Sequence, residues 1–147
     1  MKKDSALGRM TILFALFFLM SCAHVQASEE EKMLTLGASL RNLCIAMEDI
    51  VKYEILPEGL SDTELLKRAT MHDPGLLDPF NDYLVKPLIQ DNSAILLVCS
   101  KDGKVGLLED ACCSYQMDKH LWKENQPMPC KITLDIRQAC PPILRPQ

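Results

Sequence analysis

The fold of this chain is decided by the stretch SEEEKMLTLGASLRNLCIAMEDIV, residues 28–51. Ser28 and Glu31 have the spacing of a capping box, and the acids after Ser28 suit the positive end of a helix dipole. Apolar residues then recur at steps of three and four, at Met33, Leu36, Leu40, Leu43, Met47, Ile50 and Val51. This period predicts an amphipathic helix that begins at Ser28, buries one face and reaches Leu56, before Pro57 and Gly59 end it.

A shorter helix and then a change of period follow. Ser61 and Glu64 form a second capping-box pattern, which predicts a helix through Met71, closed by the sequence DPG at residues 73–75. Apolar and β-branched runs at residues 83–89, 94–100 and 105–108 predict strands, with turns at residues 90–93 and 102–103. Pro87 places the first run at a sheet edge, and residues 131–136 alternate as a last strand would. The order predicts an α+β fold, in which a long N-terminal amphipathic helix and a short helix pack on a small antiparallel sheet.

Length and charge bound the class of protein. The chain has 147 residues, which is the length of one ordinary domain. It carries 16 Lys and Arg against 20 Asp and Glu, a formal net charge of −4. The basic residues are scattered rather than gathered in a stripe, which argues against nucleic acid as a partner.

The N-terminus has the features of an export signal. The uncharged apolar run MTILFALFFLM at residues 10–20 is preceded by the basic residues Lys2, Lys3 and Arg9. The run has the length of a signal-peptide core, whereas a membrane-spanning helix needs about 20 apolar residues. We therefore expect residues 1–27 to be a signal peptide and residues 28–147 to be one domain.

Two processing sites follow this run. The sequence LMSC at residues 19–22 resembles the lipobox of bacterial lipoproteins, in which Cys22 would carry the lipid. The sequence VQA at residues 25–27 is typical of ordinary cleavage after Ala27. In the lipoprotein pathway that the first site resembles, Ala23 after the cysteine implies an outer-membrane protein facing the periplasm. The second site implies a soluble periplasmic or secreted protein.

Six cysteines lie beyond Cys22, namely Cys44, Cys99, Cys112, Cys113, Cys130 and Cys140. An even set in an exported chain predicts a disulfide framework. Cys112 and Cys113 are adjacent and cannot easily bond to each other, so we expect them to pair with Cys130 and Cys140. Cys44 would then reach Cys99, unless both are buried free thiols. The segment from Cys112 onward has few long apolar runs, so disulfides should keep it ordered.

Metal and catalytic chemistry have weaker signals. A zinc site could use Cys112, Cys113, His120, Cys130 and Cys140, but their spacing matches no paired C-x-x-C arrangement. The chain has no G-x-S-x-G elbow, no H-E-x-x-H motif and no glycine-rich phosphate loop. We therefore predict that the protein is not an enzyme and has no cofactor.

Two segments carry a family resemblance. The sequences LDPFNDYL at residues 77–84 and KDGKVG at residues 101–106 resemble motifs in the globular domain of the major pseudopilin of type II secretion systems. The order of elements over residues 29–110 is similar as well. The resemblance implies a pilin-like α+β domain, here with a disulfide-stapled C-terminal segment from residue 112, and a role in envelope structure or secretion through protein partners.

The chain departs from that family at its N-terminus and in its calcium loop. Family members carry a prepilin-peptidase site and a glutamate at the fifth mature position, and GRMTIL at residues 8–13 has no glutamate. The family binds calcium near its D-G-K loop; Asp102 matches this loop and Asp110 could replace a later acidic ligand. Calcium needs six to eight oxygen ligands, so an ordinary β-turn at residues 102–103 is the expectation.

Together these patterns predict an exported, lipid-anchored, pseudopilin-like protein with a structural or assembly role in the bacterial envelope or in protein secretion. Its partners would be envelope or secretion-system proteins, and its membrane contact would come from the lipid on Cys22. Two alternatives stay open: an authentic minor pseudopilin that retains its N-terminal helix, and a secreted module that binds a ligand or an ion.

Overall fold

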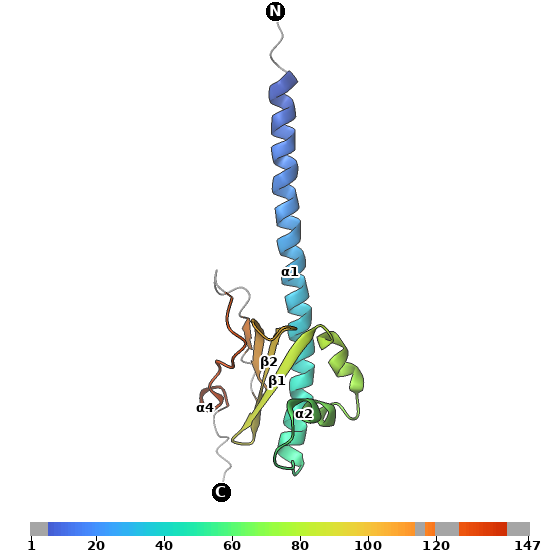
Figure 1. The fold of residues 1–147 in the computed structure, drawn as a ribbon, viewed down its shortest axis with the longest axis vertical. Coiled ribbons are helices and arrows are strands. Elements are labelled where there is room, and N and C mark those ends of the chain that lie inside the picture. The colour runs from blue at the N-terminus through green and yellow to red at the C-terminus, as the bar shows by residue number, and fades with distance from the viewer. Residues whose placement is uncertain (1–5, 114–116, 120–126, 141–147) are drawn as a thin grey trace, which may run out of the picture. The chain divides into compact units, whose positions relative to one another are not determined.

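The computed structural model of the chain describes residues 6–113, 117–119 and 127–140 (Figure 1). The chain divides into two units, Met1–Thr35 and Leu36–Gln147. The described elements are α1 (Ala6–Tyr53), α2 (Asp62–Ala69), the 3-10 helix η1 (Pro74–Phe80), β1 (Tyr83–Gln90), β2 (Ser93–Ser100), β3 (Gly106–Ala111), β4 (Met117–Lys119) and α4 (Ile136–Ala139).

Helix α1 is longer than the sequence pattern predicted. It runs without interruption from Ala6 to Tyr53, so the predicted start at Ser28 is wrong for the full chain. No glycine or proline lies between Gly8 and Gly37, and a capping residue does not begin a helix when the residues before it are helical too. Across the described parts of the chain, no helix combines the length and the apolarity needed to cross a membrane.

In the second unit, α1 packs on one face of the sheet through its predicted apolar stripe (Figure 1). The stripe residues from position 36 onward are at most 6% exposed: Leu36, Leu40, Leu43, Met47, Ile50 and Val51. Burial of one such side chain contributes about 1.5–3 kcal/mol, so this face is a main source of stability for the unit. The prediction of a buried helical stripe is confirmed here.

The predicted capping box of the second helix is also confirmed. Ser61 Oγ accepts a hydrogen bond from the Glu64 N–H at 3.3 Å, and Glu64 Oε2 accepts one from the Ser61 N–H at 2.8 Å. Helix α2 ends at Ala69, two residues earlier than predicted. The DPG sequence does not form a simple turn, because Pro74 begins η1, where a proline is favoured at the first helical position.

The sheet is antiparallel with strand order β1-β2-β3-β4. A two-residue turn joins β1 and β2 at Asp91 and Asn92, whose φ angles are 52° and 60°. Asn and Asp tolerate this left-handed conformation, which matches the twist of a tight hairpin. Pro87 lies in β1, which is paired only with β2 among the described strands, so its predicted edge position is confirmed.

The C-terminal part of the sheet differs from the prediction in three ways. Strand β3 extends to Ala111 instead of ending at Leu108, and β4 was not predicted. Residues 131–135 form no strand, and a short helix, α4, follows them. The Asp135 side chain caps this helix by accepting a hydrogen bond from the Arg137 N–H at 2.9 Å, so the alternation at residues 131–136 was a misleading signal.

Residues 127–140, which we call the C-terminal layer, cover the face of the sheet opposite to α1. Ile136 and Ala139 pack with Ile95 of β2 and Ala111 of β3 in one buried cluster. Strand β2 is therefore covered on both faces, and its residues 94–99 are fully buried. This double burial accounts for the continuous apolar run at residues 94–99, which lacks the alternation of a half-exposed strand. The second unit is thus built of three layers: α1, the sheet and the C-terminal layer.

Candidate functional site

Three disulfides join these layers: Cys44–Cys112, Cys99–Cys130 and Cys113–Cys140. The predicted disulfide framework of six cysteines is therefore confirmed. Three disulfides in one small unit indicate an oxidising compartment outside the cytoplasm. Cys112, Cys113, Cys130 and Cys140 are all oxidised, so the alternative zinc site cannot use them, and its remaining candidate, His120, lies outside the described residues.

The predicted pairing is correct only in part. Cys113 bonds to Cys140 as one of the expected pairings, and no bond joins the adjacent cysteines. The pairing of Cys44 with Cys99 is wrong, and so is their alternative assignment as free thiols, because Cys44 bonds to Cys112 and Cys99 bonds to Cys130.

The alternation of side chains in extended backbone explains the observed pairs. Consecutive residues point to opposite faces of a sheet, so Cys112 and Cys113, which follow β3 directly, reach different layers. Cys112 bonds to Cys44 of α1, and Cys113 bonds to Cys140 beside α4. Cys99 bonds into the C-terminal layer, on the face away from Cys44, and the expected Cys44–Cys99 bond would have to cross the sheet.

Two adjacent acids of β3 follow the same rule. Glu109 and Asp110 are both 0% exposed and serve opposite faces. Glu109 Oε1 accepts hydrogen bonds from the N–H groups of Thr133 at 2.6 Å and Leu134 at 2.9 Å, and Glu109 Oε2 accepts one from Thr133 Oγ1 at 2.7 Å. A buried carboxylate that accepts three hydrogen bonds replaces much of its lost hydration. Glu109 therefore fastens the C-terminal layer to the sheet.

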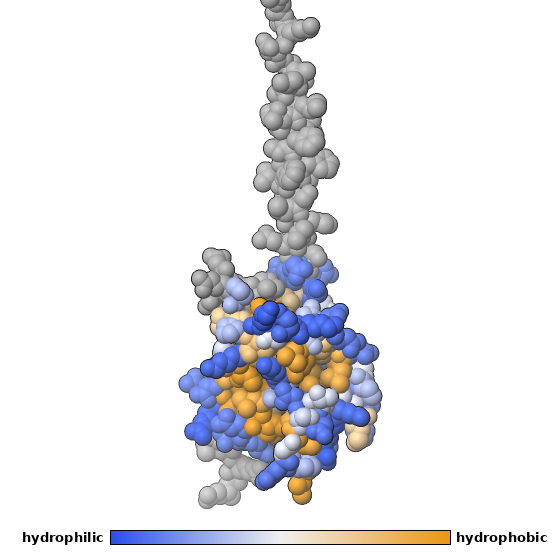
Figure 2. All heavy atoms as spheres, in the orientation of Figure 1, coloured by the Kyte–Doolittle hydropathy of each residue, from blue (hydrophilic) through white to orange (hydrophobic). Residues whose placement is uncertain are grey.

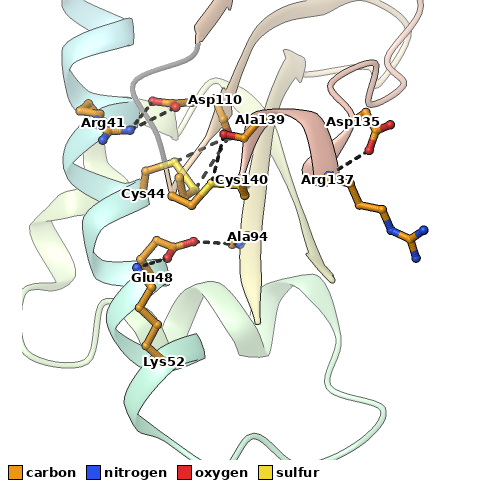
Figure 3. The surroundings of a disulfide bond; sticks show 12 residues. Arg41, Cys44, Glu48, Lys52, Ala94, Asp110, Asp135, Arg137, Ala139 and Cys140 are labelled. Atoms are coloured by element: carbon orange, nitrogen blue, oxygen red, sulfur yellow. Dashed lines mark hydrogen bonds and ion pairs between the residues drawn. A yellow bond between two sulfur atoms is a disulfide. The ribbon is translucent and has the colours of Figure 1, made fainter. Parts of the chain in front are cut away.

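Asp110 faces α1 instead. Arg41 Nη1 lies 3.3 Å from Asp110 Oδ1 and 3.5 Å from Oδ2 (Figure 3). Burial raises the pKa of the Asp110 carboxyl above its ordinary value, and the Arg41 charge opposes part of that rise. The ion pair thus lies beside the Cys44–Cys112 bond, and both join α1 to the end of β3.

Glu48 provides a third polar contact between α1 and the sheet. Its Oε1 atom accepts a hydrogen bond from the Ala94 N–H at 3.0 Å, and its Oε2 atom lies 2.6 Å from Lys52 Nζ (Figure 3). The exposed fraction of the Glu48 side chain is 8%. Sequence analysis missed Arg41, Glu48 and Glu109. For Glu48 a signal existed, since Leu40, Cys44 and Glu48 are spaced by four residues, which puts the acid on the buried face.

The two acids proposed for calcium have different surroundings. Asp102 is exposed in the turn after β2, where its Oδ1 atom accepts hydrogen bonds from Ser100 Oγ at 2.6 Å and the Lys104 N–H at 3.2 Å. These bonds, the one from Ser100 first, lower the pKa of Asp102. Gly103 has a φ of 70°, as the turn requires. Asp110 is buried against Arg41, and within the described ranges no group of three His, Cys, Asp or Glu residues could hold a metal ion.

The predicted processing sites lie in α1. Cys22 and Ala27 are helical in backbone, and the side chains before residue 29 lie outside what the structure describes. Lipidation at Cys22 and cleavage after Ala27 therefore stay predictions. No protein family, curated protein or solved structure matches this chain.

Proposed function

We propose that this is an exported, lipid-anchored, pseudopilin-like protein with a structural or assembly role in the bacterial envelope or in protein secretion. The observation that carries the proposal is the order of elements: a long helix whose C-terminal part packs on an antiparallel sheet, with a short helix and the DP motif of η1 between them. The three disulfides add support, since they suit a chain that leaves the cytoplasm.

The buried acids have structural roles, and the exposed apolar side chains support a binding role. Glu48, Glu109 and Asp110 each contact a backbone or side-chain group of a neighbouring layer, so they act in holding the layers together. Large apolar side chains are exposed on the second unit, among them Ile45, Tyr53, Ile55, Met71, Leu84 and Leu88. Figure 2 shows apolar residues gathered in the middle of one face and bordered by hydrophilic ones. Such surfaces are typical of contacts with protein partners, here envelope or secretion-system proteins.

The mass of the mature protein tests the anchor. We expect a chain that begins at Cys22 and carries the added mass of acyl groups. Cys22→Ala should then leave the membrane fraction or fail to mature, because acyl chains supply the membrane affinity of an otherwise acidic protein. A Cys22→Ala variant that fractionates with membranes as the parent does would refute lipidation. A matched control is Ala23→Asp, which keeps Cys22 and, under the sorting rule of that pathway, should move the protein from the outer to the inner membrane.

An authentic minor pseudopilin is the second candidate. The uninterrupted course of α1 from Ala6 to Tyr53 favours it, because a pseudopilin keeps its N-terminal helix in the mature protein. The same mass measurement separates the two. A mature chain that retains residues 10–27 supports the pseudopilin, whereas one that begins at Ser28 supports a soluble periplasmic or secreted protein. The secreted ion-binding module, the remaining alternative, would require calcium to raise the melting temperature.

A further inference from the structure

The three disulfides differ in how far they are shielded from solvent. Cys44 is 0% and Cys112 is 4% exposed, so that bond is buried on both sides. Cys99 is 0% exposed, whereas its partner Cys130 is partly exposed. Cys113 and Cys140 are both partly exposed. Among the described disulfides, theirs is the only one in which neither cysteine is fully buried. Thiol–disulfide exchange requires that a thiolate reach one of the two sulfur atoms, so access decides which bond reacts in the folded state.

Cys140 also borders an open cavity. The cavity measures about 340 Å³ and is lined by Asp91, Ser93, Ile136, Arg137 and Cys140. It lies where the turn between β1 and β2 meets α4, and Arg137 Nε is 3.3 Å from Asp91 Oδ2 across this junction. This volume falls in the range of small-molecule sites, and Cys140 belongs to the lining, so the cavity offers a route for an external thiol toward this residue.

We propose that Cys113–Cys140 is a thiol-exchange site that small peptide thiols open while the other two disulfides stay intact. The thiolate of the external thiol attacks Cys140 Sγ and forms a mixed disulfide there. The bond between the two protein sulfurs breaks, and Cys113 leaves as a thiolate that takes a proton from water. A second external thiol then displaces the first from Cys140, so that two external thiols are oxidised to one disulfide and the protein gains two thiols.

The consequence of opening is local. Ile136 and Ala139 cover Ile95 and Ala111, and the Cys113–Cys140 bond and the exposed Arg137–Asp91 pair also hold this end of the layer. An exposed ion pair contributes little. The rest of the C-terminal layer keeps the Cys99–Cys130 bond and the Glu109 hydrogen bonds. Exchange should therefore release α4 and uncover apolar surface of the sheet, as a redox-controlled change on a protein that otherwise stays folded.

The test uses the folded, oxidised protein and reduced glutathione, with trapping of free thiols by N-ethylmaleimide and peptide mapping over time. We expect glutathione on Cys140 and label on Cys113 to appear about tenfold faster than any label on the other four cysteines. Hydrogen exchange should show faster exchange of the Ala139 and Cys140 amides, which are bonded to Asp135 O and Ile136 O in the oxidised form. First opening of Cys99–Cys130, or simultaneous opening of all three bonds, would overturn the proposal.

A cavity-filling variant tests the route of attack. Ser93→Leu puts a larger side chain into the cavity and should slow modification of Cys140 at an unchanged melting temperature. Thr63→Leu, on an exposed position of α2 outside the cavity, is the matched control and should react as the parent does. If Ser93→Leu exchanges as fast as Thr63→Leu, the proposal that the thiol attacks through the cavity is refuted. The time course on the parent protein decides, without any variant, whether Cys113–Cys140 opens before the other two disulfides.

Discussion

Removal of the Cys44–Cys112 bond should destabilise the protein more than removal of either other disulfide. This bond closes a loop of 68 residues, whereas Cys99–Cys130 and Cys113–Cys140 close loops of 31 and 27 residues. In the chain-entropy model, a cross-link removes conformational entropy from the unfolded chain by a constant amount plus an amount that increases with the logarithm of the loop length. The corresponding losses are about 4.4, 3.7 and 3.6 kcal/mol at 25 °C. Cys44 and Cys112 are also the most buried pair, and lost packing acts in the same direction.

Urea unfolding followed by circular dichroism measures these losses. The double variants Cys44→Ala/Cys112→Ala, Cys99→Ala/Cys130→Ala and Cys113→Ala/Cys140→Ala provide a matched series in which two cysteines are replaced each time. The three losses together are comparable with the whole stability of a small domain, about 5–15 kcal/mol, so the fully reduced protein should be largely unfolded. The reasoning is refuted if the Cys113/Cys140 variant loses more stability than the Cys44/Cys112 variant while the free energy of unfolding of both decreases equally steeply with urea concentration.

Three further predictions concern the acids. Burial raises the folded-state pKa of Asp110 above its ordinary value of 3.8. The contribution of Asp110 to the free energy of unfolding should therefore be full below pH 3.8 and decrease as pH rises through the folded-state pKa. Asp110→Asn should remove this pH dependence from the urea midpoint. Glu109→Ala should lower the free energy of unfolding by about 3 kcal/mol, since two N–H groups and a hydroxyl lose their acceptor. Glu109→Gln should lower it much less in the same assay, because its amide oxygen and NH₂ group can bond to the same partners. Calcium should leave the melting temperature of the parent and of Asp102→Ala unchanged, and a rise of several degrees in the parent alone would revive the ion-binding alternative.

Local signals predicted the elements whose causes lie close together in the chain. The apolar stripe from Leu36 to Val51 is buried as its period required, and Ser61 and Glu64 cap α2 as their spacing required. The turn at Asp91 and Asn92 follows from residues that tolerate a positive φ. Where a capping box lies inside a longer helical segment, the helix continues through it. Ser28 does not begin a helix, because the residues before it are helical as well.

The alternation at residues 131–136 failed as a strand signal for a different reason. A strand forms only where a neighbouring edge offers hydrogen bonds, and the N–H groups of Thr133 and Leu134 are instead taken by the Glu109 carboxylate. Glu109 and Asp110 lie within β3, beyond the predicted end of that strand. Each of these acids can be buried there because it has a partner in a different layer, Thr133 for Glu109 and Arg41 for Asp110. Neither partner can be found from the residues adjacent in sequence.

The sequence by itself determined the helical stripe and the hairpin turn within residues 90–93, because each depends on residues within a few positions of one another. The even number of cysteines beyond Cys22 could be counted directly, and it predicted a disulfide framework. Only the tertiary structure decided which cysteines pair and which acids are buried. Alternation in extended backbone sends Cys112 and Cys113, like Glu109 and Asp110, to opposite faces, but it does not say what covers each face. That α1 covers one face and residues 127–140 cover the other follows from packing between segments far apart in the chain, and this packing placed Cys44 opposite Cys112 and Cys140 opposite Cys113.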